Sequence, residues 1–94
     1  MGSTMSDTNR IRTSPHVEFT AVDGEVVLLD RRSGVYFGLN EIGSLIWQGL
    51  VKNLSVDEIL TAIEKQYEVD RRTLLADLSR LLDTMQAKGL IQVS

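Results

Sequence analysis

The chain has 94 residues, no cysteine, and a net charge of −3 from 10 basic and 13 acidic side chains. Its length suits one small domain, and its 43% apolar residues are typical of globular proteins. Without cysteine it has no disulfide, zinc–thiolate site or cysteine nucleophile. Its acidic charge argues against general affinity for nucleic acid. No apolar run approaches the roughly 20 residues of a membrane span. No signal peptide is recognisable, so we expect a cytoplasmic protein.

The first residues differ from the rest of the chain. Residues 1–14 are polar and lack periodicity, which predicts a disordered tail before a single domain over residues 15–94. Residues 1–4 resemble a vector-derived remnant, with the natural start at Met5. The only histidine, His16, has no partners at ligand spacing, which favours a surface residue over a metal ligand.

Three strands are predicted in the first half of the chain. Residues 17–22 alternate in polarity, and Asp23 and Gly24 then form the strongest short hairpin signal. Residues 26–29 are apolar on both faces, which predicts a central strand. After a polar turn, residues 35–39 again alternate and give the third strand.

Three helices are predicted after the strands. The first covers residues 41–51 behind the N-cap Asn40. Ser55 and Glu58 have the spacing of a capping box for the second helix, and Asp70 caps the third and longest one. The sequence therefore predicts an α+β fold of winged-helix-like outline, with a three-stranded antiparallel N-terminal sheet followed by three helices.

The third predicted strand is the most informative segment. In a simple meander it lies at an open edge of the sheet, yet it has none of the Lys, Pro or inward charges that usually protect an edge. A glycine inside it lets another backbone approach closely. Such an edge invites a peptide to add as an extra strand. The predicted peptide-binding residues of this strand are Val35, Tyr36, Phe37, Gly38 and Leu39.

The third helix is the predicted second wall of a peptide groove. Its apolar stripe includes Leu75, Leu78 and Leu82, which we expect to contact apolar side chains of the peptide. Arg71 and Arg72 lie in its first turn, where cations oppose the helix dipole. We expect them to meet acidic residues of the peptide, the alternative being two solvated charges.

The sequence allows two explanations for the only tryptophan. Trp47, at the margin of the first helix's apolar face, is either half-buried core or a partner contact.

Other function classes are less compatible with the sequence. The chain has no convergent nucleophile, base or metal ligands, so we expect a non-enzyme without cofactor. A winged-helix outline also permits DNA binding, but Asp77 and Asp83 interrupt the cations of the third helix. Ser44 follows Gly43 rather than aspartate, unlike the modified serine of acyl-carrier proteins.

From Val17 to Ile91 the chain resembles the PqqD-like family, whose members recognise ribosomally made, modified peptides. The Leu-Leu-Asp-x-x-x-Gly-x-Tyr-Phe-x-Leu-Asn run is similar to the stand-alone proteins of lasso-peptide biosynthesis. The Pro-Glu-Gly element of the quinone-cofactor branch is absent, and Arg31-Arg32-Ser33 stands in its place. The other matching runs are Val27-Leu28-Leu29-Asp30, Gly34 to Glu41, Ile46-Trp47, Asp77-Leu78, Leu81-Leu82, Met85 and Gly89-Leu90-Ile91.

The resemblance implies a partner and a mode of binding. The leader of a precursor peptide would add antiparallel to the third strand, in a groove shared with the third helix. The protein would present the precursor to a separate, transglutaminase-like cysteine leader peptidase, and an ATP-dependent macrolactam synthetase would act afterwards. The alternatives are a PqqD-type role serving a radical enzyme and, outside the family, a winged-helix DNA-binding protein.

Overall fold

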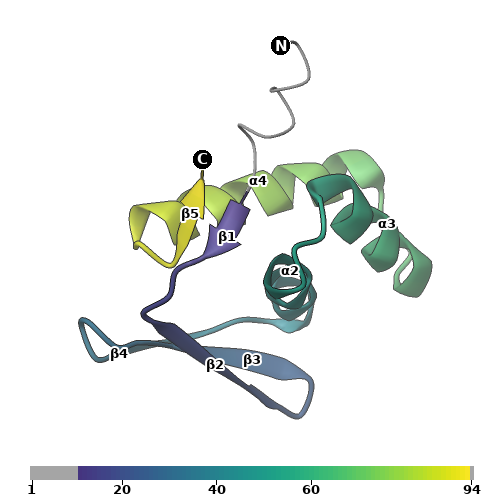
Figure 1. Cartoon of the computed structure of the whole chain (residues 1–94). Helices are drawn as coiled ribbons and strands as arrows, with labels where there is room; N and C mark the ends of the chain where they lie inside the picture. Colours follow the sequence, from purple (N-terminus) through teal and green to yellow (C-terminus); the bar gives the residue numbers. More distant parts are fainter. Residues whose placement is uncertain (1–10, 94) are drawn as a thin grey trace, which may run out of the picture.

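The computed structural model describes residues 11–93 (Figure 1). Three helices follow the strands of the main sheet, which confirms the predicted α+β fold. In chain order the elements are β1 (Ile11–Thr13), β2 (Val17–Val22), β3 (Glu25–Asp30), β4 (Val35–Gly38), α2 (Glu41–Val51), α3 (Val56–Gln66), α4 (Arg71–Ala87) and β5 (Ile91–Val93).

The main sheet is antiparallel with strand order β2-β3-β4, so β3 is central and β4 is an edge strand, as predicted. Phe19 of β2 and Phe37 of β4 both lie opposite Leu28 of β3. The β2–β3 hairpin turns through Asp23 at φ 52° and Gly24 at φ 83°, the positive values that a tight primed turn requires.

A second, two-stranded sheet corrects the predicted extent of the tail. Residues 11–13, expected to be disordered, form β1 and pair antiparallel with β5. The Ser14 amide donates to the Leu90 carbonyl at 3.0 Å, and the Ser14 hydroxyl donates to the Gly89 carbonyl at 2.8 Å. A three-residue strand is too short to show periodicity, and its partner lies at the opposite end of the chain. Residues 1–10 lie outside the described residues.

Helix α2 connects the sheet to the other helices. Trp47 on α2 is fully buried and meets the Phe19 ring edge-on at 6.1 Å, so it belongs to the core rather than to a partner-binding surface. The hydroxyl of buried Ser44 accepts a hydrogen bond from the Val26 amide at 2.7 Å and fastens α2 to β3. The predicted caps of the three helices are all present, namely Asn40, the Ser55–Glu58 capping box and Asp70.

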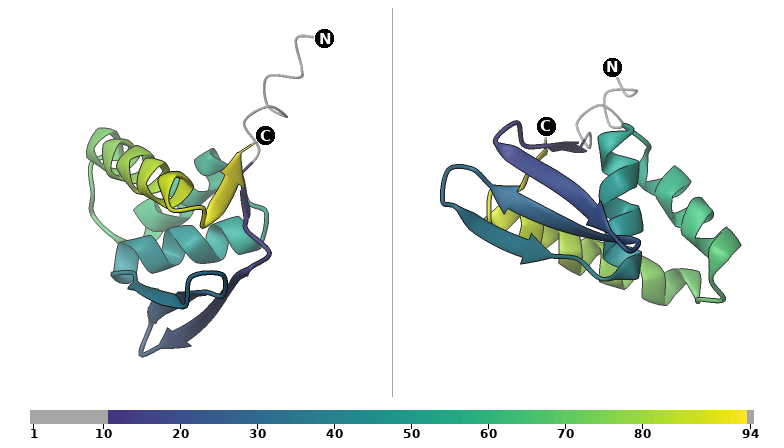
Figure 2. Two further views of the ribbon diagram at one scale, coloured as in Figure 1. Left: turned by 90° about the vertical axis from the view of Figure 1, so that its left-hand side faces the viewer. Right: turned by 90° about the horizontal axis from the view of Figure 1, so that it is seen from below.

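The arrangement leaves one face of the main sheet free of helices. Helix α2 packs on the inner face of the sheet, and α4 runs across the molecule behind it (Figure 2). In the view from below, the sheet lies in front of the helices, and its outer face is not covered by any described helix (Figure 2). No helix within residues 11–93 has the length and apolar character needed to cross a bilayer.

Candidate functional site

The free edge of β4 exposes backbone hydrogen-bonding groups. The Leu39 amide donates to the Val26 carbonyl at 2.9 Å, just beyond the β3–β4 ladder. Because successive residues of an antiparallel strand point their amides to opposite sides, the Phe37 amide also faces β3. The amides and carbonyls of Tyr36 and Gly38 therefore face away from the sheet. This edge can accept one more strand through the backbone groups of Tyr36 and Gly38, which form no hydrogen bonds to β3.

The side chains of β4 divide between the two faces of the sheet. Phe37 lies opposite the buried Leu28, and Val35 opposite Asp30, so both point to the inner face, toward the helices. Phe37 is half-buried, whereas Val35 is 46% exposed. Tyr36 lies opposite Leu29 on the outer face and is 68% exposed, so its phenol ring points away from α4. Only the backbone amide and carbonyl of Tyr36 therefore face the free edge.

A groove of about 540 Å³ lies beside the end of β4. One wall is the chain from Gly38 to Asn40 with the first turns of α2, and the other is a face of α4. The floor is apolar, with Ile42 and Ile46 of α2 and Leu74 and Leu81 of α4. The polar rim on α4 consists of Thr73, Asp77, Arg80 and Thr84. A peptide strand on β4 would turn every second side chain toward this groove.

The three leucines predicted for the helix wall do not line this groove. Leu78 is 1% exposed and belongs to the core, and neither Leu75 nor Leu82 lines the groove. At 3.6 residues per turn, Leu75, Leu78 and Leu82 share one flank of α4, and the polar rim residues share nearly the opposite flank. The apolar stripe correctly indicated which side of the helix is buried, but the groove opens along one margin of that stripe. The four rim residues are spaced four, three and four positions apart, so the sequence alone could have shown that they share one flank of the helix.

The structure also gives Arg71 another role. Its guanidinium forms ion pairs with Asp57 and Glu64 of α3, on the flank of α4 away from the groove. These two carboxylates explain why a cation is tolerated in the first turn of α4. Arg72 is exposed and forms no ion pair with any residue between 11 and 93. Neither arginine lines the groove, so their predicted contact with leader acids is not supported by this geometry.

Two other cations stand beside the binding edge, and sequence reasoning missed them. Arg80 pairs with Asp77 at 3.1 Å on the groove rim. Lys88, the C-cap of α4, holds its Nζ 5.2 Å above the centroid of the Phe37 ring. This cation–π contact joins the C-terminal end of α4 to the middle of β4.

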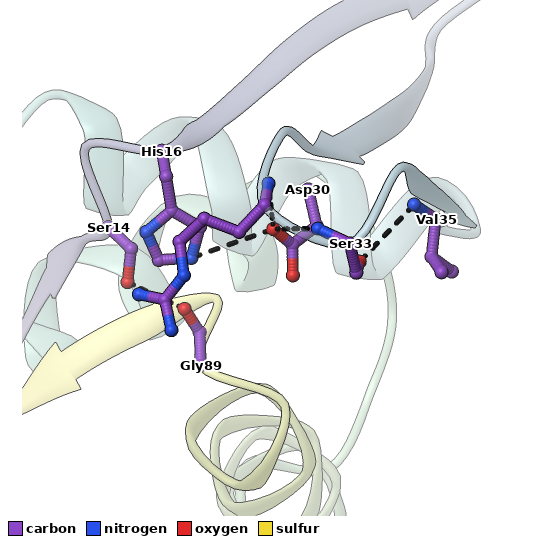
Figure 3. A network of polar contacts seen from close by, with 7 residues as sticks. Ser14, His16, Asp30, Ser33, Val35 and Gly89 are labelled. Atoms are coloured by element: carbon purple, nitrogen blue, oxygen red, sulfur yellow. Dashed lines mark hydrogen bonds and ion pairs between the residues drawn. The ribbon is translucent and has the colours of Figure 1, made fainter.

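The turn that leads into β4 is organised around Asp30. The carboxylate accepts hydrogen bonds from the amides of Arg32 at 2.9 Å and Ser33 at 3.4 Å, and His16 Nε2 lies 3.8 Å away (Figure 3). These amides, that of Arg32 first, hold the pKa of Asp30 below its ordinary value, and burial opposes them. Gly34 completes the turn at φ 76°. The turn fixes where β4 begins and therefore the register of the binding edge.

Replacing Asp30 with asparagine should reduce the acid sensitivity of folding. Because the pKa of Asp30 is lowered in the folded state, that state binds fewer protons than the unfolded chain. The stabilisation is complete above the ordinary pKa and is lost as the pH falls through the folded one. Below about pH 4, the free energy of unfolding should therefore fall more steeply for the wild type than for Asp30→Asn. Urea titrations over a pH series measure both curves, and parallel curves would contradict this role of Asp30.

The arrangement is suited to binding. Within residues 11–93, no group of three or more histidine, aspartate or glutamate side chains is placed to hold a metal ion. The groove has an apolar floor, a mixed-charge rim and an adjoining strand edge. It can hold an extended peptide through backbone hydrogen bonds and apolar side-chain contacts.

A protein-family model matches most of the chain. The family model for coenzyme PQQ synthesis protein D (PqqD) matches residues 25–91. The chain belongs to the PqqD family. The matched segment begins at β3 and ends at the first residue of β5, so it contains the β4 edge and both walls of the groove. No curated protein matches the chain.

Two solved structures resemble this PqqD family member closely. One is described as TbiB1 in complex with the TbiA(beta) leader peptide, with 40% identity and a TM-score of 0.81. It covers 86% of this chain and 94% of its own. The other is described as lasso peptide synthetase B1 complexed with the leader peptide, with 30% identity and a TM-score of 0.80. It covers 88% of this chain and 98% of its own.

Proposed function

We propose that this protein binds the leader segment of a lasso-type precursor peptide by strand addition to β4. The observation that carries the proposal is the free β4 edge beside an apolar groove, with Tyr36 and Gly38 directing their backbone groups outward. The two similar structures support it, because both are complexes with leader peptides. The description of the second, as a lasso peptide synthetase B1, also favours the lasso type over a role beside a radical enzyme.

The expected binding mode follows from the geometry of β4. A leader strand that runs antiparallel to β4 exchanges hydrogen bonds with Gly38 and Tyr36. Its residues opposite Leu39, Phe37 and Val35 turn their side chains to the inner face. Leader residues two positions apart therefore fill the groove beside Leu81 and pack along Phe37. Backbone bonds supply affinity with little dependence on sequence, and the groove selects apolar side chains.

The role we assign is delivery rather than catalysis. The bound precursor is presented to a separate cysteine leader peptidase of the transglutaminase-like type, and a macrolactam synthetase then closes the ring. Holding the precursor near the peptidase raises its local concentration without a catalytic group on this protein. The DNA-binding alternative is less compatible with α4, because Asp77 and Asp83 stand among its exposed cations.

A binding titration coupled to a cleavage assay tests the proposal. A fluorescein-labelled TbiA(beta) leader peptide is the probe, and a scrambled peptide of the same composition is its control. We expect saturable binding of the leader alone. We also expect faster cleavage of a leader-bearing precursor by its peptidase, no cleavage by this protein alone, and no stimulation for a leaderless substrate. Equal binding of the scrambled peptide, or processing by this protein alone, would overturn the proposal.

A further inference from the structure

The direction in which β4 runs past the groove determines where the two ends of a bound leader lie. The β3–β4 turn lies on the side of the molecule where α4 ends, and Lys88 at that end of α4 stands over Phe37 (Figure 2). The chain that leaves β4 at Gly38 borders the groove, together with Thr73 and Asp77 from the first half of α4. This inference rests on the proposed function, in which the leader binds antiparallel to β4. The leader therefore runs in the direction opposite to β4. Its N-terminal part lies in the groove, and its C-terminal continuation leaves past Val35, over the β3–β4 turn.

The surface at this exit is basic, although the protein is acidic overall. The Arg31 side chain is 61% exposed, and within residues 11–93 its one ion pair is with the equally exposed Glu18, at 3.5 Å. Arg32 is also exposed. Asp30, the residue before these arginines, has a largely buried carboxylate that already accepts hydrogen bonds from the amides of the turn. The turn therefore presents its positive charges outward and keeps its own acid inside.

The turn is also held rigidly against the rest of the molecule. Ser33 accepts a hydrogen bond from the Val35 amide, and the Arg31 amide donates to the His16 carbonyl at 2.9 Å. Figure 3 shows the His16 ring directed toward Asp30 and the Ser14 hydroxyl directed toward the carbonyl of Gly89, two residues beyond the end of α4. The acidic side chains of α3 lie at the other end of α4, around Arg71. An enzyme approaching the exit thus meets a fixed, positively charged surface.

We infer that the β3–β4 turn, through Arg31 and Arg32, is the docking face for the enzyme that cuts the leader, and that this enzyme contacts it with an acidic surface. The bond to be cut lies C-terminal to the bound leader segment, so the enzyme must reach the peptide as it leaves over this turn. Complementary charge at that place accelerates association and orients the enzyme toward the emerging peptide.

Two double variants of equal net charge test the docking face. In the first, Arg31 and Arg32 become glutamine. In the control, two exposed lysines away from the β3–β4 turn become glutamine, Lys52 at the end of α2 and Lys65 of α3. Both are checked for folding by thermal denaturation and for binding of the labelled TbiA(beta) leader. A precursor with that leader, held below its KM for the peptidase that cuts it, is then used to measure stimulation.

We expect both variants to bind the leader like the wild type. Stimulation of cleavage should fall at least about fivefold for Arg31→Gln with Arg32→Gln and stay unchanged for the control. A nitroxide at the C-terminus of the leader should broaden amide resonances of residues 31–34, and one at its N-terminus those near Thr73. Full stimulation by the exit variant, an equal loss in the control, or the reverse pattern of broadening would overturn this inference while leader binding stands. Failure of the wild type to bind the leader would instead overturn the proposed function, and this inference with it.

Discussion

Replacing Gly38 with proline should abolish measurable leader binding while the protein stays folded. The Gly38 amide faces the free edge, so proline removes a donor to the leader without removing a hydrogen bond between β3 and β4. The lost hydrogen bond alone accounts for about 1 kcal/mol. The proline ring also stands where the leader backbone must approach, which prevents the neighbouring bonds from forming. Fluorescence polarisation of the labelled leader measures the loss.

Gly38→Ala is the matched control for this change. A Cβ at Gly38 meets no atom within 4 Å, and the amide is retained, so alanine should fold normally and keep most of the affinity. Circular dichroism and thermal denaturation establish that both variants are folded. If a folded Gly38→Pro variant bound the leader as tightly as the wild type, β4 would not be the edge to which the leader adds.

The fold could be predicted closely because its signals are local. The alternation of residues 17–22 and 35–39, the Asp23-Gly24 turn and the caps Asn40 and Asp70 each act within a few residues of chain. Strand β1 could not be predicted, because three residues carry no periodic pattern and β1 depends on pairing with the far end of the chain.

The position of β4 at the sheet edge was predictable from the sequence, and the flank of α4 that faces the groove was not. The β4 edge follows from strand order and from the absence of protecting residues, both of which can be read from local sequence. The choice between the two flanks of α4 depends on where α3 packs. Arg71 turns toward Asp57 and Glu64 of α3, which leaves the flank with Thr73 and Arg80 to face β4. An apolar stripe indicates the buried direction of a helix but not which margin borders a groove.

Replacing Phe37 with alanine should weaken leader binding by roughly 1–3 kcal/mol, about five- to 150-fold. The ring lies on the inner face of β4, half-buried, with the Lys88 ammonium above it. A leader residue opposite Phe37 turns its side chain to the same face and packs on this ring. Removing the ring takes away that apolar contact and frees Lys88, while the outward amides of Tyr36 and Gly38 remain. Binding should therefore weaken rather than vanish.

The Phe37 variant also loses core contacts, so stability and binding must be separated. Truncating a large apolar side chain costs about 2–5 kcal/mol of folding free energy at buried sites, and less at a half-buried one. Ile63→Ala on α3 is the control, because Ile63 is 1% exposed, lies outside the groove and should lose at least as much stability as Phe37→Ala. With both variants assayed well below their unfolding temperatures, Ile63→Ala should bind the leader like the wild type and Phe37→Ala should not. Equal affinities for the two variants would mean that the Phe37 ring supports the sheet without contacting the leader. The selectivity for apolar residues would then come from the groove floor of Ile42, Ile46, Leu74 and Leu81 alone.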